Sequence, residues 1–160
     1  MSESLFNAAD LIRMAIEDER AGKALYAALS KKVSNQELKK TFQSLLEQEK
    51  VHQAAFEKML AEYVQSPMHE EYAGQYMEYL RVLLQERAIP NEAAALAEAG
   101  KCADDHAALG LASQMERDTL MLFHELESLL PPNTRHVMDA VALEERQHLI
   151  TLAQARRNLP

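Results

Sequence analysis

The feature that most restricts how this chain can fold is an internal repeat of acidic and histidine positions. The motif "EKVH" at 49–52 returns in type as "ERQH" at 145–148, 96 residues later. A glutamate followed by arginine precedes each motif, Glu19 in the first half and Glu116 in the second. Three positions therefore repeat in the same order, which indicates a duplicated helical hairpin.

The composition favours helix over sheet. Only 4 Gly and 5 Pro occur among 160 residues, and 48% of the residues are hydrophobic. Hairpin dipeptides such as Asn-Gly are scarce, whereas the good helix formers Ala, Leu, Glu, Gln and Met are common. Since a chain of this length can bury one sizeable core, we expect a single all-α domain over residues 1–160.

Start and stop signals divide the chain into four long helices and a connecting segment. Ser34, with Glu37 three residues later, suggests a capping box before the second long helix. Within the connection, Pro67 and Asn91 mark the starts of two further helices, the second of which ends near Gly100. We expect bundle helices at about residues 4–31, 35–64, 103–130 and 134–158, with the connection at 66–100. Such lengths predict an elongated four-helix bundle with a long crossover between its second and third helices.

The repeated acidic and histidine positions fall on the apolar side of these helices. Glu19, for example, has Ile12 and Ile16 at helical spacing, and Glu145 has Val141. A glutamate and a histidine three residues apart share one side of a helix. Six side chains should therefore point inward: Glu19, Glu49, His52, Glu116, Glu145 and His148.

Inward carboxylates need partners, because moving a charge from water into an apolar core costs several kcal/mol. A pair of divalent iron or manganese ions would supply them, since four carboxylate charges balance two dications. One glutamate from each of two helices, with Glu-x-x-His from each of the other two, is the ligand pattern of di-iron carboxylate bundles.

With these motifs the sequence resembles the ferritin-like superfamily, and within it the rubrerythrin-like di-iron proteins. The resemblance rests on "AIEDERAGKALYAAL", "LEQEKVH", "LASQMERDTLMLF" and "LEERQHLITL". The link "YLRVLLQERAIPNEAAALAE" is also similar to that of stand-alone rubrerythrin-like domains, so the resemblance covers nearly the whole chain. It implies a ferritin-like four-helix bundle with additional helices in the connection between bundle helices two and three.

The resemblance also implies a role for each inward residue. Glu19 and Glu116 would each be the single carboxylate ligand of one metal. Glu49 and Glu145 would lie near both metals, and His52 and His148 would each bind one metal. The chain departs from the rubrerythrin pattern at two places. Its single Cys102 cannot form the four-cysteine iron site of a rubredoxin-like domain, so we expect that domain to be missing. Thr119 stands where many relatives carry a further glutamate.

The function implied by the resemblance is that of a non-haem di-iron protein. It would bind two Fe ions and react with H2O2 or O2, as a peroxidase or a ferroxidase in oxidative stress or iron handling. Mn or Zn would fit the same ligands. A separate electron donor protein could be a partner, and a homodimer is expected because closed two-fold assembly is the commonest oligomer. The alternatives are an iron-storage cage subunit, and a helical interaction protein that keeps a structural metal site.

Charge and hydropathy exclude other partner classes. The net charge of −8 argues against nucleic acid and anionic membrane surfaces, both of which call for a basic face. No signal-peptide pattern opens the chain, and no run of 18 apolar residues occurs. The lone cysteine fits a reducing compartment, so the expected location is cytoplasmic.

Several residues near the motifs have competing interpretations. Tyr26 lies two turns from Glu19 on the same side, where its hydroxyl could hydrogen-bond a ligand carboxylate and support the metal site; an ordinary core tyrosine is the alternative. Glu144 could replace Glu145, but it breaks the 96-residue offset. We expect three acids close to the motif glutamates in the sequence to be solvated: Glu17, Asp18 and Glu47. Surface or capping roles are expected for His69, His106, His124 and His136.

Overall fold

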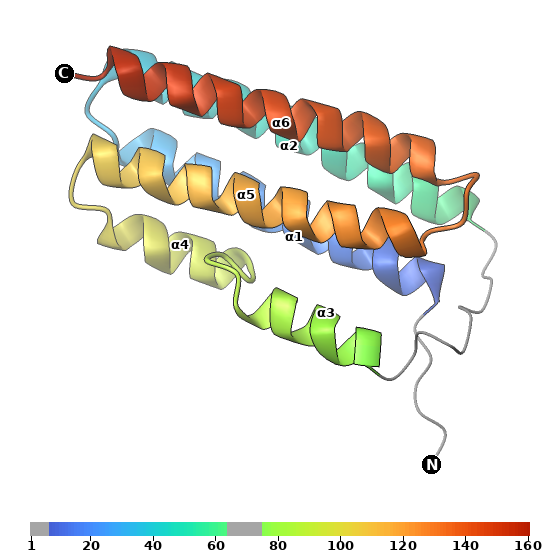
Figure 1. Cartoon of the computed structure of the whole chain (residues 1–160). Helices are drawn as coiled ribbons and strands as arrows, with labels where there is room; N and C mark the ends of the chain where they lie inside the picture. Colours follow the sequence, from blue (N-terminus) through green and yellow to red (C-terminus); the bar gives the residue numbers. More distant parts are fainter. Residues whose placement is uncertain (1–6, 64–74) are drawn as a thin grey trace.

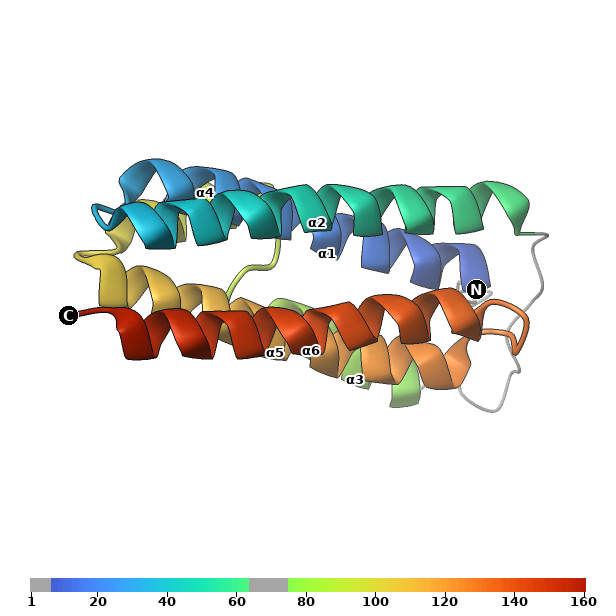
Figure 2. The same ribbon diagram turned by 90° about the horizontal axis from the view of Figure 1, so that it is seen from above.

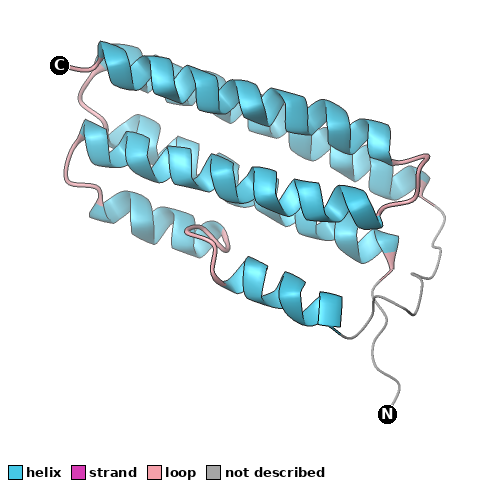
Figure 3. Ribbon diagram, viewed as in Figure 1, coloured by secondary structure: helices cyan, strands magenta, loops and turns pink. Residues whose placement is uncertain are grey.

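The computed structural model describes residues 7–63 and 75–160 (Figure 1). The helix start expected at Pro67 and the side chain of His69 lie outside these residues. The helices are α1 Ala8–Lys32, α2 Gln36–Glu62, α3 Gln75–Gln85, α4 Glu92–Lys101, α5 Asp105–Leu129 and α6 Arg135–Asn158. No strand occurs among the described residues (Figure 3). The all-α prediction is therefore confirmed. No described helix is long and apolar enough to cross a bilayer.

Four long helices, α1, α2, α5 and α6, form an elongated bundle (Figures 1 and 2). Around the bundle, α1 contacts α2, α2 contacts α6, α6 contacts α5, and α5 contacts α1. Neighbouring helices run antiparallel, whereas α2 and α5, on opposite corners, run in the same direction (Figure 2). The connection between α2 and α5 must therefore return along the full length of the bundle, and this is the long crossover expected from the sequence.

The crossover carries α3 and α4, which follow the outside of the bundle (Figure 1). α4 packs against α1 and α5. Leu80 of α3 and Ala95 of α4 are fully buried, so the crossover contributes to the core.

Side chains cap most of the helix starts. Asn7 forms a capping box with Asp10, and Asn91 accepts a hydrogen bond from the Ala94 N–H, as the sequence predicted for this cap. The expected cap at Ser34 is wrong, because Asn35 caps α2. Ser34 and Asn35 instead donate their backbone N–H groups to the Asp105 carboxylate, 2.9 and 2.8 Å away, which ties the α1–α2 turn to the start of α5.

The core consists of two apolar clusters at different levels of the bundle. One contains Leu25, Leu29, Phe42, Leu45, Leu109 and Leu152. The other contains Leu11, Ile12, Phe56, Leu122, Phe123 and Met138. Glu19 lies between residues of the two clusters along α1, and Glu49 lies between Leu45 and Phe56 along α2. A polar layer therefore separates the clusters at mid-bundle.

Candidate metal centre

The polar layer consists of six buried side chains, two on α2, two on α6 and one each on α1 and α5. Their exposed fractions are 0 to 3%: Glu19, Glu49, His52, Glu116, Glu145 and His148. Each occupies an apolar-face position of an amphipathic helix, so helix register alone turns it inward. The structure thus brings together all six residues that the repeat singled out.

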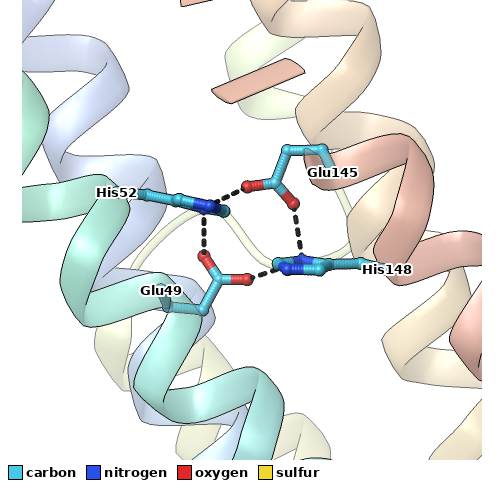
Figure 4. Close-up of side chains that lie close together, drawn as sticks. All are labelled: Glu49, His52, Glu145 and His148. Carbon is cyan, nitrogen blue, oxygen red and sulfur yellow. Dashed lines mark ion pairs between the residues drawn. The ribbon is translucent and has the colours of Figure 1, made fainter. Parts of the chain in front are cut away.

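Four of the six form a ring in which carboxylates and imidazoles alternate (Figure 4). Glu145 Oε1 lies 2.7 Å from His52 Nδ1, and its Oε2 lies 2.9 Å from His148 Nδ1. Glu49 Oε1 lies 3.2 Å from His148 Nδ1, and its Oε2 lies 3.9 Å from His52 Nδ1. Each carboxylate therefore directs one oxygen toward each histidine. One ligand-type atom from each of these four residues lies within 4.8 Å of those of the other three, so the group could hold a metal ion.

The remaining two carboxylates lie at opposite ends of this ring. Glu19 Oε2 is 3.6 Å from His52 Nδ1, and Glu116 Oε1 is 3.3 Å from His148 Nδ1. Each histidine thus has one carboxylate of its own and shares two others. The imidazole rings stack, with centroids 5.3 Å apart.

Many polar atoms of this layer have no hydrogen-bond partner. Seven atoms of the described residues are buried without one: Glu19 Oε1 and Oε2, Glu49 Oε1, His52 Nδ1, Glu116 Oε2, and Glu145 Oε1 and Oε2. A buried polar atom left unsatisfied costs about 1–3 kcal/mol, and more when it is charged. Seven in one layer would be a large penalty, which two cations would remove by accepting these atoms as ligands. The residues present therefore fit a pair of metal ions.

Burial and mutual proximity shift the pKa values of the side chains in the layer. Burial raises the pKa of Glu19 and Glu145 well above the usual range, and the charge of Glu49 adds to both effects. Burial also acts to raise the pKa of Glu49, but the neighbouring Glu19 carboxyl and His148 imidazole outweigh it and lower that pKa. Burial disfavours the imidazolium of His148, yet the carboxylates of Glu116, Glu145 and Glu49 beside its Nδ1 raise its pKa to about 12.

Tyr26 reaches the layer from the α1 side. Its hydroxyl donates a hydrogen bond to Glu116 Oε1 on the neighbouring helix α5. Burial raises the pKa of Tyr26, with Glu116 adding to the effect, so the phenol stays protonated and donates. Of the two carboxylate oxygens of Glu116, only Oε2 is left without a partner.

The outer ring nitrogens of both histidines also have partners, which the sequence reasoning missed. His52 Nε2 lies 2.8 Å from Glu144 Oε2, and His148 Nε2 lies 3.1 Å from Gln48 Oε1. Glu144 thus contacts the outer side of His52 from the exposed face of α6, while Glu145 faces the layer. A signal was present, because Gln48 and Glu144 are separated by the same 96 residues as the two motifs.

Asp18, expected to be solvated, is buried, so that prediction is wrong. Its carboxylate pairs with the guanidinium of Arg87, a residue of the crossover. It also accepts a 2.6 Å hydrogen bond from Thr119 Oγ1. Burial raises the pKa of Asp18 to about 6, against the opposing effect of Arg87. The crossover covers this side of α1, which local helical periodicity could not reveal. The other acids expected to be solvated, Glu17 and Glu47, are exposed.

The other described histidines lie outside the layer. His106, His124 and His136 are exposed, and His106 Nε2 lies 3.0 Å from the Pro160 carbonyl oxygen. Gly22 lies against the layer instead: a Cβ at this position would sit 3.3 Å from Glu49 Oε2. The missing side chain lets Glu49 approach α1 closely.

Comparison with known proteins agrees with the fold and with the layer. A solved structure from Thermotoga maritima, described as a ferritin-like diiron-carboxylate protein, superposes with a TM-score of 0.64 at 25% sequence identity over 96% of both chains. No curated protein sequence matches this chain. The Rubrerythrin family model matches residues 10–105, which is more than half of the sequence. The chain therefore belongs to the rubrerythrin family.

Proposed function

We propose that the polar layer binds two iron ions and that the loaded protein reacts with H2O2 or O2, as a peroxidase or a ferroxidase. The observation that carries this proposal is the set of seven buried, ligand-type atoms without hydrogen-bond partners. The description of the Thermotoga maritima protein as a diiron-carboxylate protein supports iron over other cations.

The distances support a separate ligand role for each side chain. One metal position would be held by Glu19 and His52 Nδ1, the other by Glu116 and His148 Nδ1. Glu49 and Glu145 would hold both, because each has one oxygen near each histidine. Four carboxylates would then neutralise two dications, so the filled layer carries no net charge in an apolar core.

Bound ferrous ions would supply the electrons that reduce peroxide or dioxygen. The chain contributes position and environment. Tyr26 holds one oxygen of Glu116 in place, and the apolar clusters above and below keep bulk water from the layer. Because the single cysteine cannot form a four-cysteine iron site, repeated peroxide reduction would draw electrons from a donor site outside these 160 residues.

The first test is metal content after expression in iron-supplemented medium. About two irons per chain are expected in the wild type, the number implied by the six-ligand pattern. The Glu49→Ala/Glu145→Ala variant should lose both, because it removes the shared carboxylates. A Glu17→Ala/Glu47→Ala variant, which removes two exposed acids from α1 and α2, serves as the control and should retain both irons. A wild type without stoichiometric metal would contradict the proposal.

Stopped-flow mixing of the Fe(II)-loaded protein with H2O2 tests the reaction itself. Iron oxidation should be faster than that of free Fe(II) under the same conditions. Stoichiometric metal without accelerated oxidation would favour the structural-metal alternative, and sedimentation as a particle many times heavier than a dimer would favour the storage-cage alternative.

A further inference from the structure

We infer that Glu144 and Gln48 make the two metal positions unequal, so that the position of Glu19 and His52 binds a divalent cation more tightly than that of Glu116 and His148. The inference rests on the proposed function, because it concerns the same six ligands. It goes beyond that function in assigning a role to two residues outside the ligand set.

The two residues occupy equivalent places in the duplicated hairpin. Gln48 directly precedes Glu49 on α2, and Glu144 directly precedes Glu145 on α6. Each reaches across to the histidine of the opposite helix: Glu144 to His52 Nε2 at 2.8 Å and Gln48 to His148 Nε2 at 3.1 Å. The contact is thus reciprocal in geometry but not in chemistry, since one acceptor is a carboxylate and the other an amide.

The tautomer follows from the ligand geometry. Both Nδ1 atoms face the shared carboxylates, so a metal bound at Nδ1 leaves the proton on Nε2, which donates outward. A hydrogen bond to a carboxylate is shorter and about twice as strong as one to a neutral acceptor. It also makes the imidazole a more basic ligand, and removing such a partner typically costs about 10- to 100-fold in metal affinity. The side chain of Glu144 is 56% exposed, so its long-range charge is screened and the direct hydrogen bond carries the effect.

A second asymmetry acts in the same direction. Tyr26 donates to Glu116 Oε1, and this hydrogen bond draws electron density from the carboxylate and makes it a weaker ligand. Glu19 has both oxygens without a hydrogen-bond partner and can offer both. Phe123 is the repeat equivalent of Tyr26 and has no hydroxyl to donate. His52 is therefore a stronger ligand than His148, and Glu19 a stronger ligand than Glu116.

Co(II) titration of the metal-free protein, followed by its visible absorption with a competing chelator, measures the two affinities separately. The wild type should bind two ions in steps separated by at least tenfold. Single-position variants identify the steps: Glu116→Ala should keep the tighter binding and Glu19→Ala the weaker.

The outer partners are then exchanged in these two backgrounds. Glu144→Gln should weaken Co(II) binding about 10- to 100-fold in Glu116→Ala and leave it unchanged in Glu19→Ala. As the matched control, Gln48→Glu should strengthen binding only in Glu19→Ala. Two ions bound with equal affinity, or an equal response of both backgrounds to Glu144→Gln, would overturn the inference while leaving the proposed function intact. A wild type that binds no Co(II) would overturn both.

Discussion

The two halves of the bundle each present two glutamates and one histidine inward but surround them differently. In the first half, Asp18 is buried beside Glu19, whereas the equivalent position of the second half is Met115. Tyr26 of the first half donates to Glu116, whereas its equivalent Phe123 packs edge-on against Phe56. The first half therefore carries two buried polar groups beside the layer, Asp18 and Tyr26, where the second half has apolar side chains.

This difference distinguishes the residues that a metal pair needs from the surrounding residues that can vary. The inward glutamates and histidines recur in both halves because the polar layer needs them in matched pairs. The residues around them have diverged, since each needs only a local partner. The crossover adds to the asymmetry by placing Arg87 against α1, next to Asp18. The predictions below make the halves more alike, or separate them further.

The largest effect is expected from Arg87→Met. Both side chains of the Arg87–Asp18 pair are 6% exposed, so the variant leaves a buried carboxylate without its cation and should lose about 3–5 kcal/mol of unfolding free energy. Urea denaturation of the metal-free protein measures this loss. Asp18→Met/Arg87→Met gives the first half the apolar residue found at Met115 and should recover most of it, because well-packed apolar residues often replace a buried pair without cost. A double variant as unstable as the single one would contradict this account.

Metal-free protein should become less stable as the pH rises from 4 to 8. A buried acid with a raised pKa holds its proton in the folded state at a pH where the unfolded chain has released it, so its stabilising effect is complete below the unfolded pKa and is lost as the pH passes the folded one. Asp18, raised from 3.8 to about 6, accounts for about 3 kcal/mol at 1.36 kcal/mol per pKa unit. Glu19 and Glu145 act in the same direction.

Thermal unfolding in the presence of a chelator across this pH range tests the trend. Asp18→Asn should flatten the curve of stability against pH between pH 4 and 6, because this part of the curve comes from Asp18, which only the first half carries. Stability of the metal-free wild type that rises steadily with pH would contradict the raised values.

Glu19→Ala and Glu116→Ala remove equivalent carboxylates and create cavities of similar size. They should nevertheless differ in stability by about 1–3 kcal/mol, because only Glu116→Ala leaves the buried Tyr26 hydroxyl without its acceptor. Urea denaturation of both metal-free variants gives the difference. Repeating the pair in a Tyr26→Phe background should abolish it, and a difference that persists there would have another origin.

The smallest effect concerns Gly22. Alanine is the better helix former by about 1 kcal/mol, but a Cβ here would lie 3.3 Å from Glu49 Oε2. Gly22→Ala should therefore gain less stability than the control Gly110→Ala, whose Cβ would meet nothing within 4 Å. Gly22→Ala should also weaken Co(II) binding, whereas Gly110→Ala should not. Denaturation midpoints and Co(II) titration distinguish the two, and equal gains with unchanged binding would show that Glu49 has room to move.

Much of the architecture could be predicted because it depends on local spacing. A period of 3.6 residues determines which side of each helix is apolar, so the inward direction of Glu49 and His52 follows from residues within two turns. The repeat then identified equivalent positions in α5 and α6 without any alignment. The predicted helix ends were less accurate. Ser34 and Asn35 are both good caps, and the choice between them depends on Asp105, whose carboxylate accepts hydrogen bonds from both backbone N–H groups.

The sequence by itself determined the helical class, the duplicated hairpin and the six inward side chains, since these depend on residues a few positions apart. Only the tertiary structure decided the partners outside the layer. Asp18 meets Arg87, Tyr26 meets Glu116, and Glu144 meets His52 across separations of 69, 90 and 92 residues. Such contacts depend on which helices become neighbours and at what relative height. Both are fixed when the apolar faces pack together, a global outcome that no local pattern encodes.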